Sequence, residues 1–512
     1  MVGAMTVLSR ITGLARDIVF AQILGSGLFA DAFFVAFRIP NFFRRIFAEG
    51  AFSAAFVPVY SEFEARGVES ETKAFLDLVL GRLCLILFIV TIFGVIGAKF
   101  LVIGLAPGYQ AEPEKFQATV DALRFTFPYL FFISLVSMAG GILNTRGRFA
   151  VPAATPILLN ICLMGAIVLL SQKFDTPTVA LAVGVLIAGV IQFGFQLPFL
   201  QLERRLPIPK LRPSNREVES DLEGTNKVFR LMLPALFGVS VAQFNLLINT
   251  VLASFLVTGS VSWLYYSDRL MEFPLGVFGI TLATVILPTL SIQHSNKAAD
   301  DFSGTLDWAL RLAWLLSAPA SVALIVLAEP LMISFFQYGE FSSFDANMAG
   351  RSLAAFASGL FAFVSVKVLA PAFFARQDTK TPVKAGAIAV VVNILFSLLL
   401  IRPLAHVGLA VATSIAGFVN AGLLYWWLRV DRIYKPANGW LSYFLRVTFA
   451  AALMGLVIAL FANDPRSWLE ASATSRVTLL VKEVLVGSSV YFLTLYAMGI
   501  RLGAVLRNKK ND

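Results

Sequence analysis

Apolar stretches of about 20 residues recur along this chain from end to end, and no other feature limits its fold as strongly. A helix of about 20 apolar residues crosses roughly 30 Å of hydrocarbon and satisfies its backbone hydrogen bonds internally. The composition agrees, because 58% of the 512 residues are hydrophobic and 14% are charged. One soluble core cannot bury that much apolar surface. We therefore predict an all-α polytopic membrane protein with about fourteen transmembrane helices.

The basic residues lie mostly in alternate loops, which gives a topology. Arg146 and Arg148 lie in one such loop, the segment from Leu202 to Thr225 holds several more, and the C-terminal tail is basic, while the intervening loops carry few. Basic loops stay on the cytoplasmic side of a membrane. Both termini are therefore predicted in the cytoplasm, with the chain in an inner membrane. The net charge of +10 then reflects topology anchors rather than a nucleic-acid partner.

The sequence also repeats itself at a constant offset. Pro58 and Pro288 lie 230 positions apart, and the same offset relates Asp77 to Asp307. We interpret this as two parallel lobes of six helices each, with a central cavity between them. Two further helices, predicted from Leu441 to Phe461 and from Leu479 to Leu506, follow the repeat. The predicted domains are an N-lobe (1–201), a cytoplasmic linker loop (202–225), a C-lobe (226–430) and a C-terminal helix pair (431–512).

Charged residues inside apolar runs point to the functional site, because each costs about 2.5–3.5 kcal/mol at a helix centre. They concentrate in the predicted first, second and eighth helices. Those singled out are Arg10, Arg16, Asp31, Arg38, Arg44, Arg45, Glu49, Asp268, Arg269 and Glu272. An anion-binding cavity is one interpretation. The alternative is a structural network, because pairs such as Arg45 and Glu49 stand four residues apart on one helical face.

Other chemistries find little support in the sequence. Cys84 and Cys162 lie in separate apolar runs, and His294 and His406 have no cysteine or histidine nearby, so we predict no metal site. The chain has no glycine-rich phosphate loop and no nucleophile elbow. We therefore predict a transporter without a cofactor rather than an enzyme.

The charged segments carry a specific resemblance. SRITGLARD, DAFFVAFRIPNFFRRIFAEGAFSAAFVPVY and YYSDRLMEFPLGVFG resemble the MurJ (MviN) lipid II flippase family, within the multidrug, oligosaccharidyl-lipid and polysaccharide exporter superfamily. The resemblance implies alternating-access movement of lipid II from the cytoplasmic to the periplasmic leaflet for cell-wall synthesis. It also implies membrane lipids and cell-wall synthesis or division proteins as partners, and a groove for the lipid tail at the two C-terminal helices.

The resemblance also implies roles for individual residues. The substrate-binding arginines of its cationic cavity match Arg10, Arg16, Arg44 and Arg269, and its required carboxylate matches Asp31. Glu49 and Glu272 match assisting acids, and Arg38, Arg45 and Asp268 are secondary candidates.

Alternative functions remain open at this point. A flippase for another polyprenyl-diphosphate oligosaccharide would need the same arginines, whereas a multidrug exporter would favour carboxylates unopposed by arginine. A membrane glycosyltransferase would need an acidic motif at the membrane face and a sizeable outer loop. A scaffold for cell-wall enzymes could use the loop from Leu202 to Thr225.

Overall fold

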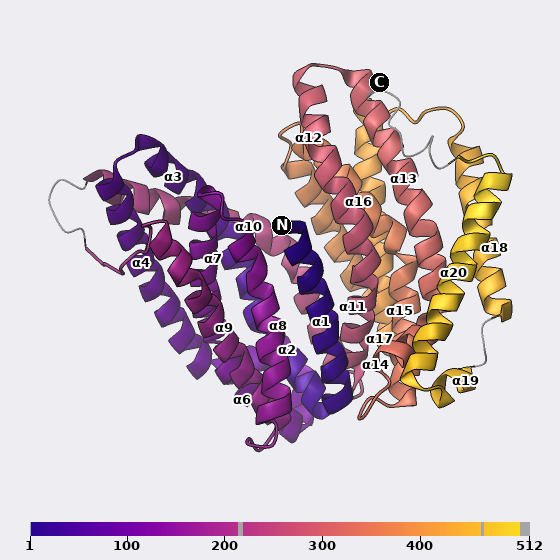
Figure 1. Ribbon diagram of the computed structural model, residues 1–512, viewed down its shortest axis with the longest axis horizontal. Coiled ribbons are helices and arrows are strands. Elements are labelled where there is room, and N and C mark those ends of the chain that lie inside the picture. Colours follow the sequence, from indigo (N-terminus) through magenta and orange to yellow (C-terminus); the bar gives the residue numbers. More distant parts are fainter. Residues whose placement is uncertain (1, 213–218, 462–464, 502–512) are drawn as a thin grey trace. The chain divides into compact units, whose positions relative to one another are not determined.

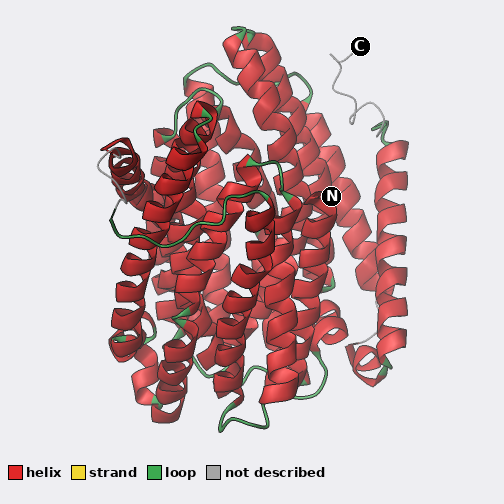
Figure 2. Ribbon diagram, turned by 60° about the vertical axis from the view of Figure 1, so that its left-hand side comes forward, coloured by secondary structure: helices red, strands yellow, loops and turns green. Residues whose placement is uncertain are grey.

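The chain is all-helical, as predicted. The computed structural model describes residues 2–212, 219–461 and 465–501, with the backbone alone at residues 2, 46–49, 219–222, 233–244, 280 and 465–466. Helices joined by loops account for these ranges, and no strand occurs in them (Figure 2). The chain divides into two compact units, Met1–Ser262 and Trp263–Asp512 (Figure 1). Each unit is described by itself below.

Twelve helical elements lie in the first unit. They are α1 (Val2–Leu24), α2 (Leu28–Phe43), the π-helix η1 (Arg44–Phe52), α3 (Ser53–Arg66), α4 (Glu69–Ile96), α5 (Ala98–Leu105), the 3₁₀-helix η2 (Pro107–Ala111), α6 (Pro113–Thr126), α7 (Tyr129–Thr145), α8 (Ala150–Leu170), α9 (Pro177–Leu202) and α10 (Glu219–Ala253). The helix α11 (Ser260–Pro274) begins in this unit and continues into the second.

The second unit continues with the π-helix η3 (Leu275–Ile280), α12 (Thr281–Ser295), α13 (Ala299–Val326), α14 (Ala328–Phe336), α15 (Ser343–Ser358), α16 (Leu360–Phe374), α17 (Lys380–Val430), α18 (Trp440–Phe461), α19 (Pro465–Glu470) and α20 (Ala473–Ala497). Among the described residues, nine helices are long and apolar enough to cross a membrane, or ten if α15 and α16 form one bent span. The 51-residue α17 also breaks at Ala405, where φ is 49° and ψ is −129°. A multi-pass membrane protein is confirmed, and fourteen crossings remain consistent with this count.

Helix boundaries confirm the internal repeat. The helix α4 begins at Glu69 and α13 begins at Ala299, which is 230 residues later, and both contain 28 residues. The helices α8 and α17 begin at Ala150 and Lys380, again 230 residues apart. Each unit also carries a π-helical segment at the equivalent place, η1 and η3. Such segments are rare and often mark functional sites, and η1 begins at Arg44.

Two aspartates at equivalent positions of the repeat, Asp77 and Asp307, make similar contacts in their units. Asp77 of α4 accepts a hydrogen bond from the backbone N–H of Ile208 at 2.8 Å and pairs with Lys210 at 2.9 Å. Its counterpart Asp307 of α13 accepts from the hydroxyl of Tyr434 at 2.8 Å and from the N–H of Ala437 at 3.0 Å. Each carboxylate therefore anchors the segment that follows the last helix of its repeat.

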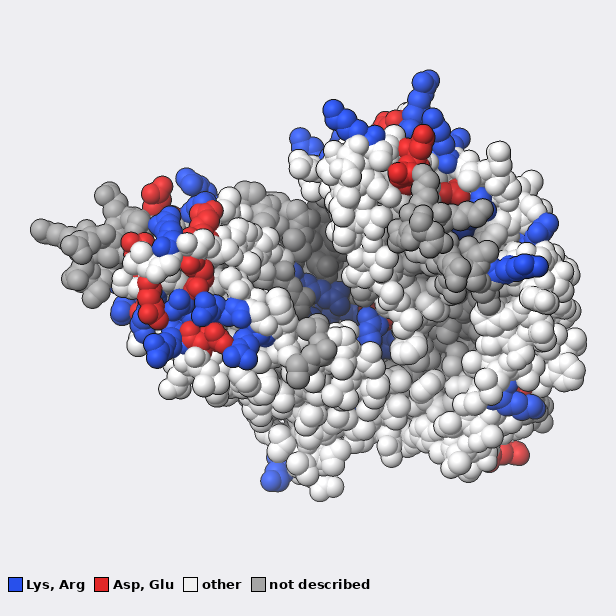
Figure 3. All heavy atoms as spheres, turned by 45° about the horizontal axis from the view of Figure 1, so that its top comes forward, with Lys and Arg blue, Asp and Glu red and all other residues white. Residues whose placement is uncertain are grey.

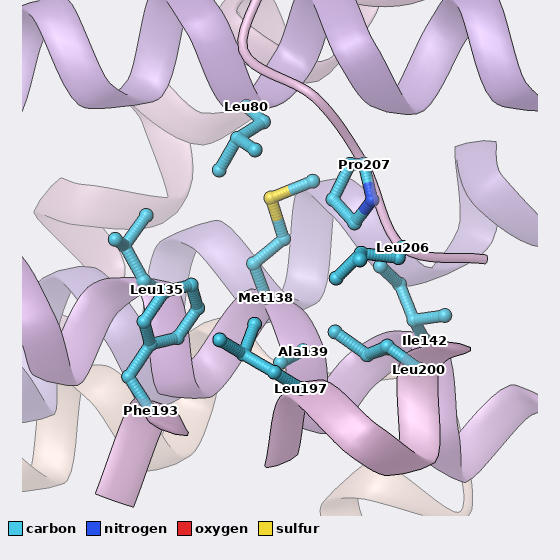
Figure 4. Close-up of a pocket in the computed structure, with 10 residues that line it drawn as sticks. All are labelled: Leu80, Leu135, Met138, Ala139, Ile142, Phe193, Leu197, Leu200, Leu206 and Pro207. Atoms are coloured by element: carbon cyan, nitrogen blue, oxygen red, sulfur yellow. The ribbon is translucent and has the colours of Figure 1, made fainter. Parts of the chain in front are cut away.

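The anchored segment after α9 covers a small apolar cavity of about 20 Å³ (Figure 4). Leu80 of α4, Met138 of α7 and Phe193 of α9 line it, and Leu206 and Pro207 close it. A space of this size with apolar walls holds no sizeable ligand. It is a packing gap beneath the linker.

A network of ion pairs joins α3, the turn between α7 and α8, and the end of α9. Glu64 pairs with Arg205 at 2.6 Å and with Arg146 at 3.3 Å. Glu203 pairs with Arg148 at 2.7 Å and with Arg146 at 3.3 Å. Figure 3 shows acidic and basic side chains gathered at one end of this unit, beside a largely uncharged flank. These residues lie in segments predicted to face the cytoplasm.

The network predicts a pH dependence of stability. The hydrogen bond from Arg148, with a further bond from Arg146, lowers the pKa of Glu203 below its usual value. A carboxyl whose pKa is depressed on folding stabilises the protein above its unfolded pKa of about 4.3 and loses that contribution as the pH falls through the folded value. We expect the Tm of the wild type to fall more steeply than that of Glu203→Gln below about pH 5. The measurement is the Tm of both proteins in detergent from pH 7 to pH 3.5. If the two Tm values fell equally with pH, the prediction would be wrong.

The C-terminal helix pair packs on α13 and on itself (Figure 1). The first helix, α18, was predicted closely, but the second was predicted to run from Leu479 to Leu506. Instead α20 begins at Ala473, where the Ser472 hydroxyl accepts a hydrogen bond from the N–H of Ser475. It ends at Ala497, because Gly499 takes φ +83° and turns the chain. Residues 502–506 of the prediction lie outside the described residues.

Glu483 lies on the inward face of α20 together with Arg476, Gly487 and Tyr491. It is 1% exposed. Neither carboxylate oxygen has a hydrogen-bond partner within the described part of the chain. A buried acceptor without a partner costs about 1–3 kcal/mol. We therefore expect the buried carboxyl of Glu483 to lower the stability of this helix pair.

We expect Glu483→Leu to raise the Tm by a few degrees, because Leu removes a buried polar group worth about 1–3 kcal/mol and keeps a similar shape. The exposed neighbour Lys482 offers a control, and Lys482→Leu should shift the Tm by less than about a degree. Thermal melting of the purified proteins compares the three. A lower Tm for Glu483→Leu would refute the prediction and show that this carboxyl has a stabilising partner.

Candidate functional site

In the first helix, the two candidate arginines have different surroundings. Arg16 is 4% exposed. Its guanidinium lies 2.6 Å from the carboxylate of Asp17 and 3.1 Å from the amide oxygen of Asn160 in α8. Arg10 is half-buried and has no hydrogen bond or ion pair with the described residues. Arg10 is thus available to an anion, whereas Arg16 is already held by carboxylate and amide oxygens.

Sequence reasoning missed Asn160, which ties α1 to α8. Its amide nitrogen donates to the carbonyl of Ser9 at 3.2 Å and to the hydroxyl of Thr12 at 3.1 Å. The residue is a single amide within the apolar run ILLNICL, and polar side chains between membrane helices commonly bond across the interface. A lone amide in an apolar run was therefore the sequence feature that could have identified Asn160.

The candidates of α2 and η1 are partly paired. Arg38 donates to the hydroxyl of Thr250 in α10 at 2.7 Å, and Arg44 donates to the amide oxygen of Asn41 at 3.1 Å. Arg44 is half-buried and Arg45 is exposed. The side chain of Glu49 lies outside the described residues, so its predicted pairing with Arg45 stays a prediction.

Asp31 lies in a buried charge cluster. Its carboxylate is 3.0 Å from the ammonium of Lys115 in α6, and each of the two side chains is 1% exposed. The same carboxylate accepts hydrogen bonds from the N–H groups of Gly259 and Ser262, at 2.8 and 2.9 Å, and from the Ser262 hydroxyl at 2.6 Å. Asp31 therefore caps the start of α11, where unpaired N–H groups favour a negative charge.

Sequence reasoning also failed to identify Lys115. Beyond Asp31, its ammonium donates to the hydroxyl of Thr258 at 3.1 Å and lies 4.3 Å from the ring centre of Tyr109. The segment EPEK reads as an exposed polar turn, and no local pattern marks this lysine as buried. A cavity-facing role for Asp31 stays a prediction, since its carboxylate is fully engaged here.

In α11, Arg269 and Glu272 form an ion pair at 3.0 Å with side chains 33% and 42% exposed. The guanidinium carbon of Arg269 also lies 5.9 Å from the ring centre of Tyr265. Asp268 is half-buried. Neither side chain is buried, so the attraction of this pair is weak compared with that of a buried pair. A competing anion could therefore replace Glu272 as the partner of Arg269.

Comparisons with known proteins assign this chain to a family. The sequence matches the family model of the lipid II flippase MurJ over residues 20–476. The probable lipid II flippase MurJ of Haemophilus influenzae is 43% identical over 97% of this chain and 98% of its own length. The lipid II flippase MurJ of Burkholderia cenocepacia is 39% identical over 99% of this chain and 98% of its own length.

Solved structures show the same fold. A lipid II flippase MurJ in an inward closed conformation superposes with a TM-score of 0.80 at 26% identity, over 98% of this chain and 99% of the other. A multidrug resistance transporter of the MATE family, from the MOP superfamily, superposes with a TM-score of 0.67 at 17% identity, over 83% of this chain and 94% of the other. That second likeness concerns the fold alone. From the match along nearly its whole length, the chain belongs to the lipid II flippase MurJ family.

Proposed function

We propose that this protein is a transporter that carries lipid II from the cytoplasmic to the periplasmic leaflet of a bacterial inner membrane, for cell-wall synthesis. The observation that carries the proposal is the 43% identity over 97% of the chain to a probable lipid II flippase. The arginines within the first, second and eighth predicted spans support it, because membrane proteins retain such costly residues for binding or transport.

Arginine suits the chemistry of this substrate. Lipid II joins a diphosphate and peptide carboxylates to a long polyprenyl chain. A guanidinium stays ionised and binds phosphate oxygens through two parallel hydrogen bonds. We assign this role to Arg10, Arg44 and Arg269, with Arg16 held in place by Asp17 and Asn160.

Two further parts of the proposal concern energy and the lipid tail. An inside-negative potential favours outward movement of an anion by about 2.3 kcal/mol per charge at 100 mV, so the loaded step needs no chemical fuel. After release, Glu272 re-pairs with Arg269 at the observed 3.0 Å and neutralises the empty site. The helices α18 and α20 receive the polyprenyl chain, because their outer faces expose apolar side chains such as Leu445, Leu456 and Leu493.

Topology and partners complete the proposal. The ion-pair network around Glu64 and Glu203 lies at the cytoplasmic end of the helices, with both chain termini on the same side of the membrane. Membrane lipids surround the protein, and cell-wall synthesis and division proteins are its proposed partners.

The test is complementation of cells depleted of their lipid II flippase, with lipid II in the outer leaflet measured directly. We expect the wild-type chain to restore growth and outer-leaflet lipid II. A well-expressed chain that restores neither would refute the proposal. If it instead restored export of another polyprenyl-diphosphate oligosaccharide, the substrate assignment would be wrong and the transporter class would stand.

A further inference from the structure

A groove of about 390 Å³ lies between α5, η2 and α6, and none of the proposed transport residues lines it. Its polar lining includes Lys99, Gln110, Gln117 and Arg124, and Phe116 and Val120 contribute apolar surface. Two cations and two amides around an open groove favour an anionic ligand with hydrogen-bonding groups.

The cations of the groove are available to a ligand. Lys99 is exposed and makes no ion pair or side-chain hydrogen bond with the described part of the chain. Arg124 makes one ion pair, with Asp121 at 3.2 Å, and its side chain is 48% exposed. Asp121 is also bound by the amide of Gln117 at 2.9 and 3.0 Å. Asp121 offsets one positive charge, so the groove keeps a net positive charge.

The groove lies where a membrane span ends. The spanning helix α4 ends at Ile96, three residues before Lys99, and the side chains of Phe93, Ile96 and Phe100 are 72%, 73% and 76% exposed. Large apolar side chains this exposed at the end of a span face acyl chains. A ligand in this groove would thus have hydrocarbon on one side and cations on the other. These surroundings match the acyl chains and the phosphate of a phospholipid.

On the proposed topology, the opposite end of α4 lies on the cytoplasmic side of the membrane. Glu69, at its start, pairs with Arg205 of the proposed cytoplasmic network at 3.2 Å. The 28 residues of α4 rise about 42 Å at 1.5 Å per residue. The groove is therefore on the outer side.

We propose that this groove binds the phosphodiester headgroup of an anionic phospholipid in the outer leaflet. Lys99 and Arg124 contact the phosphate, Gln110 and Gln117 bind headgroup hydroxyls, and the acyl chains lie against Phe93, Ile96 and Phe100. The groove lining contains none of the residues proposed to bind lipid II.

The test measures binding of phosphatidylglycerol to the full-length protein in detergent, by native mass spectrometry and by thermal shift, with phosphatidylcholine as the neutral comparison. A specific anionic lipid raises the Tm with concentration. We expect Lys99→Gln to weaken phosphatidylglycerol binding about tenfold, because one charge-assisted hydrogen bond is lost. The double variant Lys99→Gln/Arg124→Gln should lose the preference over phosphatidylcholine. Outer-leaflet lipid II should stay at the wild-type level.

Lys173 provides a matched control, since it is an exposed cation in the turn after α8, at the same end of the helices as the groove. Lys173→Gln should bind phosphatidylglycerol like the wild type. An equal loss of phosphatidylglycerol binding in this control, or unchanged binding by the double variant, would overturn the proposal. Either result would show that Lys99 merely extends its ammonium to the membrane–water interface without binding a specific lipid. Inorganic phosphate is the second arm. If it displaced the lipid at matched concentration, the ligand would be free phosphate and the lipid assignment would be wrong.

Discussion

Arg269→Ala and Arg44→Ala are expected to abolish lipid II transport while the protein still inserts and accumulates. Each substitution removes two charge-assisted hydrogen bonds to the diphosphate, at about 1.5–3 kcal/mol each. The affinity for the diphosphate should therefore fall a hundredfold or more. Folding should survive, because the side chains of Arg269 and Glu272 are 33% and 42% exposed, so the substitution leaves no buried unpaired charge. The measurement is outer-leaflet lipid II in depleted cells, with protein level by immunoblot.

Two substitutions sharpen this experiment. Arg269→Lys should restore little, because an ammonium is a point charge without the planar fork that fits phosphate oxygens. Arg148→Ala is the control, since Arg148 is a cation of the ion-pair network around Glu203 with a side chain 59% exposed, and transport should remain near wild type. Cells that grow normally on the Arg44→Ala or Arg269→Ala protein alone would exclude these roles.

Arg16→Ala should behave differently from these two variants. Removing this guanidinium breaks the buried 2.6 Å ion pair with Asp17, and breaking a buried pair costs about 3–5 kcal/mol. Low protein level is therefore expected, together with lost transport.

Lys115→Met is expected to destabilise the protein by about 3–5 kcal/mol, because it leaves the carboxylate of Asp31 buried without a counter-charge. The ion pair is 3.0 Å long and neither side chain is more than 1% exposed. Met keeps the length and apolar stem of the lysine, so packing is preserved. The measurement is the Tm of the purified protein, and we expect a fall of several degrees.

A double variant separates the charge of the pair from its packing. The Asp31→Asn/Lys115→Met protein should be more stable than Lys115→Met alone, because an amide oxygen still accepts from Gly259 or Ser262 and carries no charge to bury. Lys173→Met, at an exposed lysine, should leave the Tm unchanged. A double variant no more stable than the single one would mean that Lys115 stabilises the cluster by packing and not by charge.

The sequence by itself determined the membrane-spanning helical fold and its repeat, because both are written in local properties. Apolar run length decides whether a helix can cross a bilayer, and the 230-residue offset carries over to α4 and α13, whose bounds repeat it residue for residue. The family followed from short runs around Arg10, Arg44 and Arg269, in which residue identity alone is informative.

Only the tertiary structure decided which charges meet. Asp31 contacts Lys115, which lies 84 positions away in the sequence, and Gly259 at the start of α11, which lies 228 positions away. Arg16 contacts Asn160, which lies 144 positions away. No periodicity links such residues, because their meeting depends on how loops close and which helix faces pack together. The start of α20 was missed for a related reason. Its first turn, ATSR, is mostly polar and is capped by Ser472, so hydropathy places the start of the helix later than hydrogen bonding does.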